Sequence, residues 1–137
     1  MKEDRNKLGA DGKLKNGPYE ERFKDGSLSC TGGHRNGEKV SEWKYYLRNG
    51  RLKAVGCFVR DQMEGKWEWY RENGALMQTG AFVAGQRTGI WKRYHPNGAL
   101  YDEGAYDGER KLGEWKVYDA KGRLTKITNH KIKQEKP

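Results

Sequence analysis

The sequence predicts an all-β protein: a single-layer antiparallel meander of β-hairpins in 24-residue units, twisted and rolled. Two recurrences and one absence predict this fold. Tryptophan and, three positions later, tyrosine recur every 24 residues, at Trp43, Trp67, Trp91 and Trp115 and at Tyr46, Tyr70, Tyr94 and Tyr118. Glycine and leucine keep the same interval, as in Gly74 and Leu76, then Gly98 and Leu100. No segment has the apolar period of a helix, and a fixed period of this length is typical of repeat proteins.

The expected elements follow one another along the chain. Residues 1–16 are predicted to be a half-repeat that protects the first sheet edge, because Asp11-Gly12 recurs as Asp107-Gly108. Residues 17–125 form the repeat domain, whose first unit is degenerate and whose last has Thr128 in place of an internal glycine. Residues 126–137 are expected to be a basic tail.

Within each unit, a turn signal separates two short segments rich in aromatic residues. Asn73-Gly74 is such a signal, and Asn-Gly between apolar segments is the strongest local indication of a hairpin. If these two residues are the whole loop, counting outward places Trp67 opposite Gly80 and Gly65 opposite Phe82.

The connection between units completes the expected register. A four-residue loop over Ala84–Arg87 places Gly80 opposite Trp91 and Phe82 opposite Gly89. Gly80 then lies between two tryptophans, so we expect aromatic rings to pack on bare glycine backbone.

Strand alternation assigns the side chains to two faces. Trp67, Trp69, Arg71, Leu76 and Gln78 are expected on one face, which we call the tryptophan face. Tyr70 and Met77 are expected on the opposite face.

Composition restricts the classes of protein that the chain can belong to. Apolar residues make up 34% of the sequence and the mean hydropathy is −1.18, so a deep core is not expected. No apolar run approaches the roughly 18 residues of a membrane-spanning helix, and we expect a cytoplasmic protein without a transmembrane segment. The net charge of +9 is compatible with anionic partners. Cys30 and Cys57 are expected on opposite faces as free thiols.

Catalytic motifs are missing from the sequence. The spacing of Gly80 and Gly85 resembles a phosphate-binding loop, but Gln86-Arg87 replaces the required Lys-Ser/Thr. Asp102 and Glu103 are adjacent on a strand and point to opposite faces, so they cannot act on one bond. The histidines and cysteines lack metal-ligand spacing. We therefore expect no enzyme activity, no cofactor and no metal.

Side chains that face the tryptophan face but differ between units are the candidates for partner recognition. The residue two positions after the tryptophan is Tyr45, Trp69 or Arg93, and the residue four after it is Arg71 or His95. Asp102 joins them as the expected cross-strand partner of Arg93. Tyr, Trp and Arg are enriched in interface hot spots. The alternative is that Tyr45 and Trp69 only thicken a thin core.

The unit G-x-W-x-x-Y-x-x-N-G-x-L-x-x-x-G-x-F-x-x-G resembles the variant MORN repeat of bacterial proteins, including the YwqK-type antitoxins, over residues 17–125. Ser41, Asp61 and Thr128 depart from it. The resemblance implies a non-enzymatic immunity protein or antitoxin that neutralises a cognate toxin or effector by docking it on the curved aromatic face.

Two other functions remain open. A scaffold or surface binder of nucleic acid or anionic lipid would use the net positive charge and interleaved aromatics. A structural spacer would self-associate through its sheet edges. The oligomeric state is left open.

Overall fold

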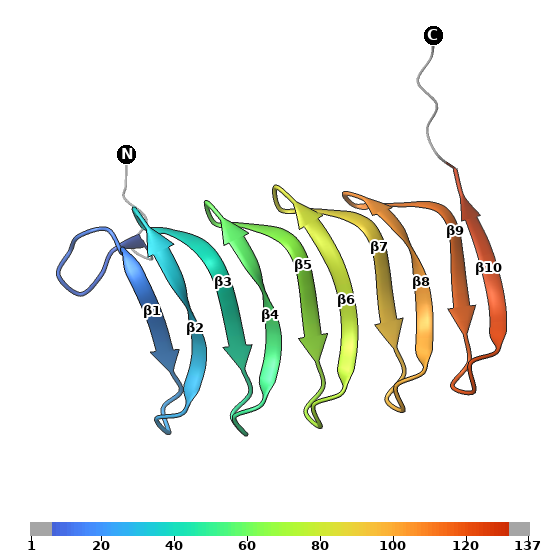
Figure 1. The fold of residues 1–137 in the computed structure, drawn as a ribbon, viewed down its shortest axis with the longest axis horizontal. Coiled ribbons are helices and arrows are strands. Elements are labelled where there is room, and N and C mark those ends of the chain that lie inside the picture. The colour runs from blue at the N-terminus through green and yellow to red at the C-terminus, as the bar shows by residue number, and fades with distance from the viewer. Residues whose placement is uncertain (1–6, 132–137) are drawn as a thin grey trace, which may run out of the picture.

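The computed structural model describes residues 7–131, which form one ten-stranded antiparallel sheet (Figure 1). The strands lie side by side in chain order: β1 (Gly17–Arg22), β2 (Leu28–Arg35), β3 (Glu38–Tyr46), β4 (Leu52–Val59), β5 (Gln62–Tyr70), β6 (Leu76–Val83), β7 (Gln86–Tyr94), β8 (Leu100–Asp107), β9 (Arg110–Tyr118) and β10 (Leu124–His130). β1 and β10 lie at opposite ends, so the sheet is not closed, and the strands bend along their length (Figure 1). The predicted single-layer hairpin meander is confirmed.

The two ends of the sheet differ from the middle units. Residues 7–16 form a small hairpin through a bridge between Leu8 and Leu14, and Gly37 N donates to Lys15 O at 2.8 Å, which fastens this hairpin to the β2–β3 turn. At the other end, β10 pairs with β9 as far as His130, so the sheet continues into the segment that was expected to be a tail from residue 126. Residues 1–6 and 132–137 of the two predicted terminal segments lie outside the described residues.

The loop within each hairpin has three residues, so the two-residue loop predicted at Asn73-Gly74 is wrong. Arg71 N donates to Ala75 O at 2.8 Å, and Gly74 has a φ of 89°. This is a turn followed by a left-handed residue, a common three-residue connection. Asn73 stabilises it, because its side-chain oxygen accepts a hydrogen bond from Ala75 N at 2.9 Å.

A β-bulge after this loop restores the predicted register. Tyr70 pairs with Leu76, whereas Trp69 pairs with Gln78, so Met77 is the extra residue. The loop residue and the bulge residue compensate each other, and the predicted pair of Trp67 with Gly80 is confirmed.

The same bulge changes two predicted faces. Leu76 is the register partner of Tyr70 and therefore shares the face opposite the tryptophan face. Met77 instead borders a hollow together with Arg71 and Gln78, on the tryptophan face. The assignments of Leu76 and Met77 are thus wrong, because strict alternation does not hold through a bulge.

The connection between hairpins is also shorter than predicted. Val83 pairs with Gln86, which leaves only Ala84 and Gly85 in the loop, at φ values of 48° and 78°. Both central residues have positive φ, as in the type I′ turns whose twist suits a two-residue hairpin. Phe82 therefore pairs with Arg87 and not with Gly89. The ladder is irregular before Trp91, where Gly89 adopts a φ of 66°.

Each tryptophan ring packs on the glycine of the preceding hairpin. The pairs are Trp43 on Gly32, Trp67 on Gly56, Trp91 on Gly80 and Trp115 on Gly104. A Cβ at any of these glycines would lie less than 3.0 Å from ring atoms, closer than side chains approach one another. The ring on Gly80 is therefore that of Trp91 in the next hairpin, and the expected packing of rings on glycine backbone is confirmed.

The indole nitrogens donate hydrogen bonds to the backbone beside the same glycines. Trp67 Nε1 donates to Cys57 O at 3.1 Å, and Trp91 Nε1 donates to Ala81 O at 3.2 Å. In both cases the acceptor is the residue directly after the glycine that lies under the ring. A buried indole N–H is therefore satisfied without a polar side chain in the core.

The core is a row of rings along the tryptophan face, which we call the aromatic ladder. Its members are Tyr19, His34, Trp43, Phe58, Trp67, Phe82, Trp91, Tyr106 and Trp115. Phe82 packs edge-on between Trp67 and Trp91, with ring centroids 6.4 and 5.1 Å away. Phe58 and Tyr106 repeat this arrangement in the neighbouring units. Trp43 and Trp67 are each 1% exposed, although no second layer of the described chain covers them. Edge-to-face pairs of this kind contribute about 0.5–1.5 kcal/mol beyond the area that they bury.

The close approach of Trp91 to Gly80 yields a prediction. Gly80→Ala should lower the free energy of unfolding by about 1–3 kcal/mol, because the new Cβ displaces the ring. Denaturant unfolding monitored by tryptophan fluorescence measures this loss. The same substitution in a Trp91→Ala background should have a smaller effect. An equal loss in both backgrounds would contradict a role for the ring.

Candidate functional site

The register gathers the side chains that vary between units into one row beside the aromatic ladder. We call these residues the variable row: Cys30, Tyr45, Ala54, Trp69, Gln78, Arg93, Asp102 and Val117. Each is the register partner of the next one in this order. The row is apolar from Cys30 to Trp69 and polar from Gln78 to Asp102, so the two halves of the tryptophan face differ in chemistry.

Tyr45 and Trp69 of the variable row pack against the core while remaining half-buried. Trp69 lies between Trp67 and Trp91, with ring centroids 6.0 and 5.6 Å away. Tyr45 stacks on Trp43 at 6.2 Å, and burial raises its pKa to about 12. Both side chains therefore thicken the core, as the alternative interpretation expected, and both still present part of their rings to solvent.

A hollow of about 440 Å³ opens in the apolar half, which we call the apolar hollow. Ala54 is the register partner of both Tyr45 and Trp69, so a methyl group lies in the row between two large rings. Phe58 and Met63 also border it. Because the ladder holds the two rings in place, the walls of this hollow are formed before anything binds.

Arg93 and Asp102 form a bidentate ion pair in the polar half. Arg93 Nη2 donates to Asp102 Oδ2 at 2.6 Å, and Nε donates to Oδ1 at 3.1 Å. Asp102 is 3% exposed, and its hydrogen bonds raise the pKa of the Arg93 guanidinium. The guanidinium also lies 4.9 Å from the ring centroid of Tyr101. The predicted cross-strand pairing of Arg93 with Asp102 is confirmed.

Arg71 and His95 connect successive units, a role that the sequence reasoning missed. Arg71 Nη2 donates to Tyr94 O at 2.8 Å, and His95 Nε2 donates to Tyr118 O at 2.8 Å. Both bonds join the residue four after a tryptophan to the tyrosine of the next hairpin. Their recurrence at equivalent positions was the available signal, although Leu47 and Asp119 occupy the position in other units.

A row of cations over the aromatic ladder was also missed. These residues stand four positions before a ladder ring, and we call them the cation row: Lys15, Lys39, Arg87 and Lys111. Their charged groups lie 4.5–5.9 Å from the centroid of the ring four residues on. A cation placed over a ring in this way gains about 0.5–1 kcal/mol at an exposed site. The third unit has Met63 instead.

A second hollow, of about 300 Å³, lies where the cation row meets the polar half, and we call it the cationic hollow. Arg87, Arg93 and Lys111 border it, with Asp102 between strands β7 and β9. Arg87 Nη2 also forms an ion pair with Glu109 at 3.0 Å, at the rim. Three positive groups therefore surround one buried carboxylate.

Comparison with known protein families identifies the middle of the chain. Residues 63–83 and 87–107 match the MORN repeat variant. Two of the chain's hairpins contain MORN repeats. Each matched segment covers nearly all of one hairpin, β5–β6 in the first case and β7–β8 in the second. A search of curated proteins gives no match.

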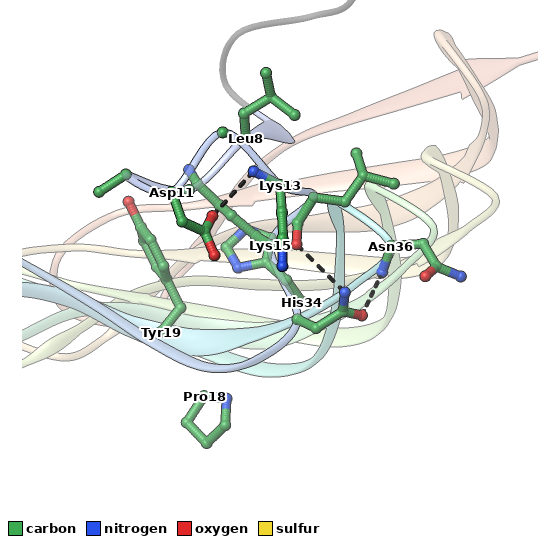
Figure 2. A pocket seen from close by; sticks show the side chains of 13 residues that line it. Leu8, Asp11, Lys13, Lys15, Pro18, Tyr19, His34 and Asn36 are labelled. Carbon is green, nitrogen blue, oxygen red and sulfur yellow. Dashed lines mark hydrogen bonds between the residues drawn. The ribbon is translucent and has the colours of Figure 1, made fainter.

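A third hollow lies beside the first unit, outside the two matched MORN repeats (Figure 2). It measures about 1090 Å³ and is bordered by the 7–16 hairpin, Tyr19 and His34. His34 occupies a ladder position between Tyr19 and Trp43, at 4.6 and 5.2 Å, and burial lowers its pKa. Lys15 stands over the Tyr19 ring at 4.7 Å.

Several other expectations concern groups that the structure places directly. Cys30 is buried and Cys57 is exposed, both as free thiols, and their register partners put them on opposite faces as predicted. Between residues 7 and 131, no group of three or more His, Cys, Asp or Glu side chains is arranged to hold a metal ion. That same range contains no helix of the length and apolarity needed to cross a membrane.

The ion pair leads to a prediction about Asp102. Arg93→Met should lower the free energy of unfolding by roughly 1–3 kcal/mol, because it leaves the buried carboxylate without its partner. Adding Asp102→Ala, the residue that Ala54 supplies in the second unit, should restore part of this loss. Urea unfolding of the two variants measures both effects. A double variant less stable than Arg93→Met alone would contradict the explanation.

Two half-buried phenols predict a loss of stability at high pH. The pKa of Tyr19 and of Tyr45 is raised to about 12 from 10.0. Between these values the unfolded chain loses protons that the folded chain keeps, so stability present below about pH 10 falls as the pH rises towards 12. Tyr45→Phe should make this fall shallower. Denaturant unfolding at several alkaline pH values tests it, and an unchanged pH dependence in the variant would contradict the assignment to Tyr45.

Proposed function

We propose that the chain is a non-enzymatic protein-binding protein that acts as an immunity factor or antitoxin and docks its toxin on the tryptophan face. One observation carries this proposal. The side chains that differ between units gather in the variable row and border two hollows, whereas the side chains that recur build the ladder. A repeat protein that recognises one partner needs this separation of an invariant support from a variable surface.

The repeat type and the charge support the proposal. The match of two hairpins to the MORN repeat variant supports a repeat protein, and the antitoxin role rests on the resemblance of the repeat unit to YwqK-type antitoxins, described mainly as interaction or immunity proteins. The net charge of +9 favours a partner that is acidic where it docks. Two free thiols suit a reducing compartment, and we place the protein in the cytoplasm.

The cation row favours a second candidate function, the binding of nucleic acid or anionic lipid. Lys15, Lys39, Arg87 and Lys111 lie over aromatic rings on one face, and phosphate groups bind such cations. Met63 interrupts the row, and Glu109 takes up part of the charge of Arg87. Affinity for a phosphate ligand should fall steeply with salt, whereas docking on packed rings should change little.

Co-expression tests the proposal. In a bacterial host, the chain should protect cells against the toxic product of the gene adjacent to its own, and the two proteins should co-purify. Trp69→Ala should weaken binding at least about tenfold, because aromatic truncations at interface centres have effects of this size. The readouts are growth and calorimetric affinity.

Tyr70→Ala is the matched control, since Tyr70 is the next residue, is also half-buried and points to the opposite face. Circular dichroism establishes that both variants fold. Absence of protection and of a complex would overturn the proposal. Equal weakening by the two variants would show that the tryptophan face is not the docking surface.

A further inference from the structure

We propose that the tryptophan face recognises a protein segment at two points: a large apolar side chain enters the apolar hollow, and a carboxylate enters the cationic hollow. The inference rests on the proposed function, because it names the chemistry of the docking partner. It commits to an acidic segment that crosses the strands and carries one apolar anchor.

The apolar hollow is lined mainly by apolar side chains, as an apolar anchor requires. Tyr45 and Trp69 flank Ala54, so the space between the rings is floored by a methyl group. Met63 borders the same hollow, in the one described unit whose ring is not covered by a cation. An entering side chain therefore meets mainly carbon and sulfur, and the charged side chains that border the hollow are Glu21 and Lys53. Pockets that receive interface anchors are of this kind.

The cationic hollow has positive groups that can bind a carboxylate of a partner. Asp102 is held in bidentate fashion by Arg93. Arg87 lies 4.1 Å from the Tyr106 centroid, and Lys111 lies 4.5 Å from that of Trp115, so the rings fix both heads at the rim. Of Arg87 and Lys111, only Arg87 forms an ion pair with a described residue, Glu109.

That ion pair is weak enough to be replaced. The Glu109 side chain is 88% exposed in the short turn between β8 and β9, and exposed pairs contribute little. A carboxylate from a partner, desolvated against the rings, can take the place of Glu109 on Arg87 and lie near Lys111. Charge-assisted hydrogen bonds to Arg are the strong ones.

The register sets the separation of the two points. Ala54 lies on β4 and Asp102 on β8, four strands apart in the sheet. With neighbouring strands about 4.8 Å apart, the hollows are roughly 19 Å from each other. An extended chain covers about 3.3 Å per residue, so the apolar and acidic residues of the segment should stand about six positions apart.

These features favour a protein segment over a nucleic acid. A nucleic-acid strand carries a phosphate at every nucleotide and would meet a mainly apolar hollow, bordered by the acidic Glu21, along one half of the face. The buried carboxylate of Asp102 lies in the other half. An acidic segment needs only one carboxylate at the cationic hollow and none at Tyr45 and Trp69.

Selection of peptides by the full chain tests the inference without a known toxin. The probe is a phage-displayed library of random 16-residue peptides, selected against the immobilised protein. Enriched peptides should share a large apolar residue and an Asp or Glu about six positions away. Fluorescence anisotropy of a synthetic copy then gives the affinity for variants.

Each hollow has its own variant. Ala54→Leu extends the side chain of a 6% exposed residue into the apolar hollow and should weaken binding at least about tenfold, with circular dichroism establishing that the variant folds. Arg87→Gln with Lys111→Gln removes the charge at the cationic hollow and should weaken binding to a similar extent. Lys66→Gln with Lys92→Gln makes the same change of charge on the opposite face and should leave the affinity unchanged.

Three results would overturn the inference: no enrichment, enriched peptides without the apolar and acidic pair, or peptides that bind Ala54→Leu as tightly as the parent. Binding of a fluorescent thymidine 12-mer, weakened by the same variants, would also overturn it in favour of nucleic acid. Its failure is separate from that of the proposed function. A toxin complex that survives all these variants would refute the two-point recognition and leave the immunity function standing.

Discussion

The structure depends on the contact between a tryptophan ring and the bare backbone of a glycine in the preceding hairpin. A lone two-stranded hairpin is marginally stable in water, and this sheet has no second layer over the described residues to bury its apolar face. Where Trp91 packs on Gly80, the glycine backbone shields one side of the ring from water, and the ring shields the backbone. The indole N–H then finds its acceptor on the next residue, Ala81. Each unit thereby completes the core of the preceding unit.

The sequence was sufficient for the fold and for most of the register, because the 24-residue period exposes which residues must meet. It was insufficient for the loops. Asn73-Gly74 signals a turn but does not distinguish a two-residue loop from a three-residue loop with a compensating bulge at Met77. Gly80 still pairs with Trp67, since the extra loop residue and the bulge residue cancel. The faces of Leu76 and Met77 could not be right, because they depend on the bulge itself.

The sequence predicted some of the contacts that the candidate-site residues make and missed others. Arg93 and Asp102 followed from cross-strand counting and are paired. Arg71 and His95 were chosen for varying on the tryptophan face, yet each bonds a backbone carbonyl of the next unit. Such a bond depends on side-chain reach in three dimensions and not on face alone. The cation row could have been predicted from one further comparison between units. The two hollows could not be predicted from the sequence, because they depend on the small side chain of Ala54 and on the burial of Asp102 in the folded sheet.

The last strand has a consequence for how many units the protein can hold. Thr128 on β10 occupies the position at which Gly104 receives the ring of Trp115 in the preceding unit. An aromatic ring delivered by the first strand of another copy, where Tyr19 stands, would meet a branched side chain instead of bare backbone. Among the described residues, the edge of β10 therefore has backbone hydrogen-bonding groups without a strand partner. It lacks the glycine on which a ring of a further unit would pack. Threonine at this position therefore disfavours the growth of the sheet by addition of another copy, because the packing of a ring on glycine that joins the other units is lost there.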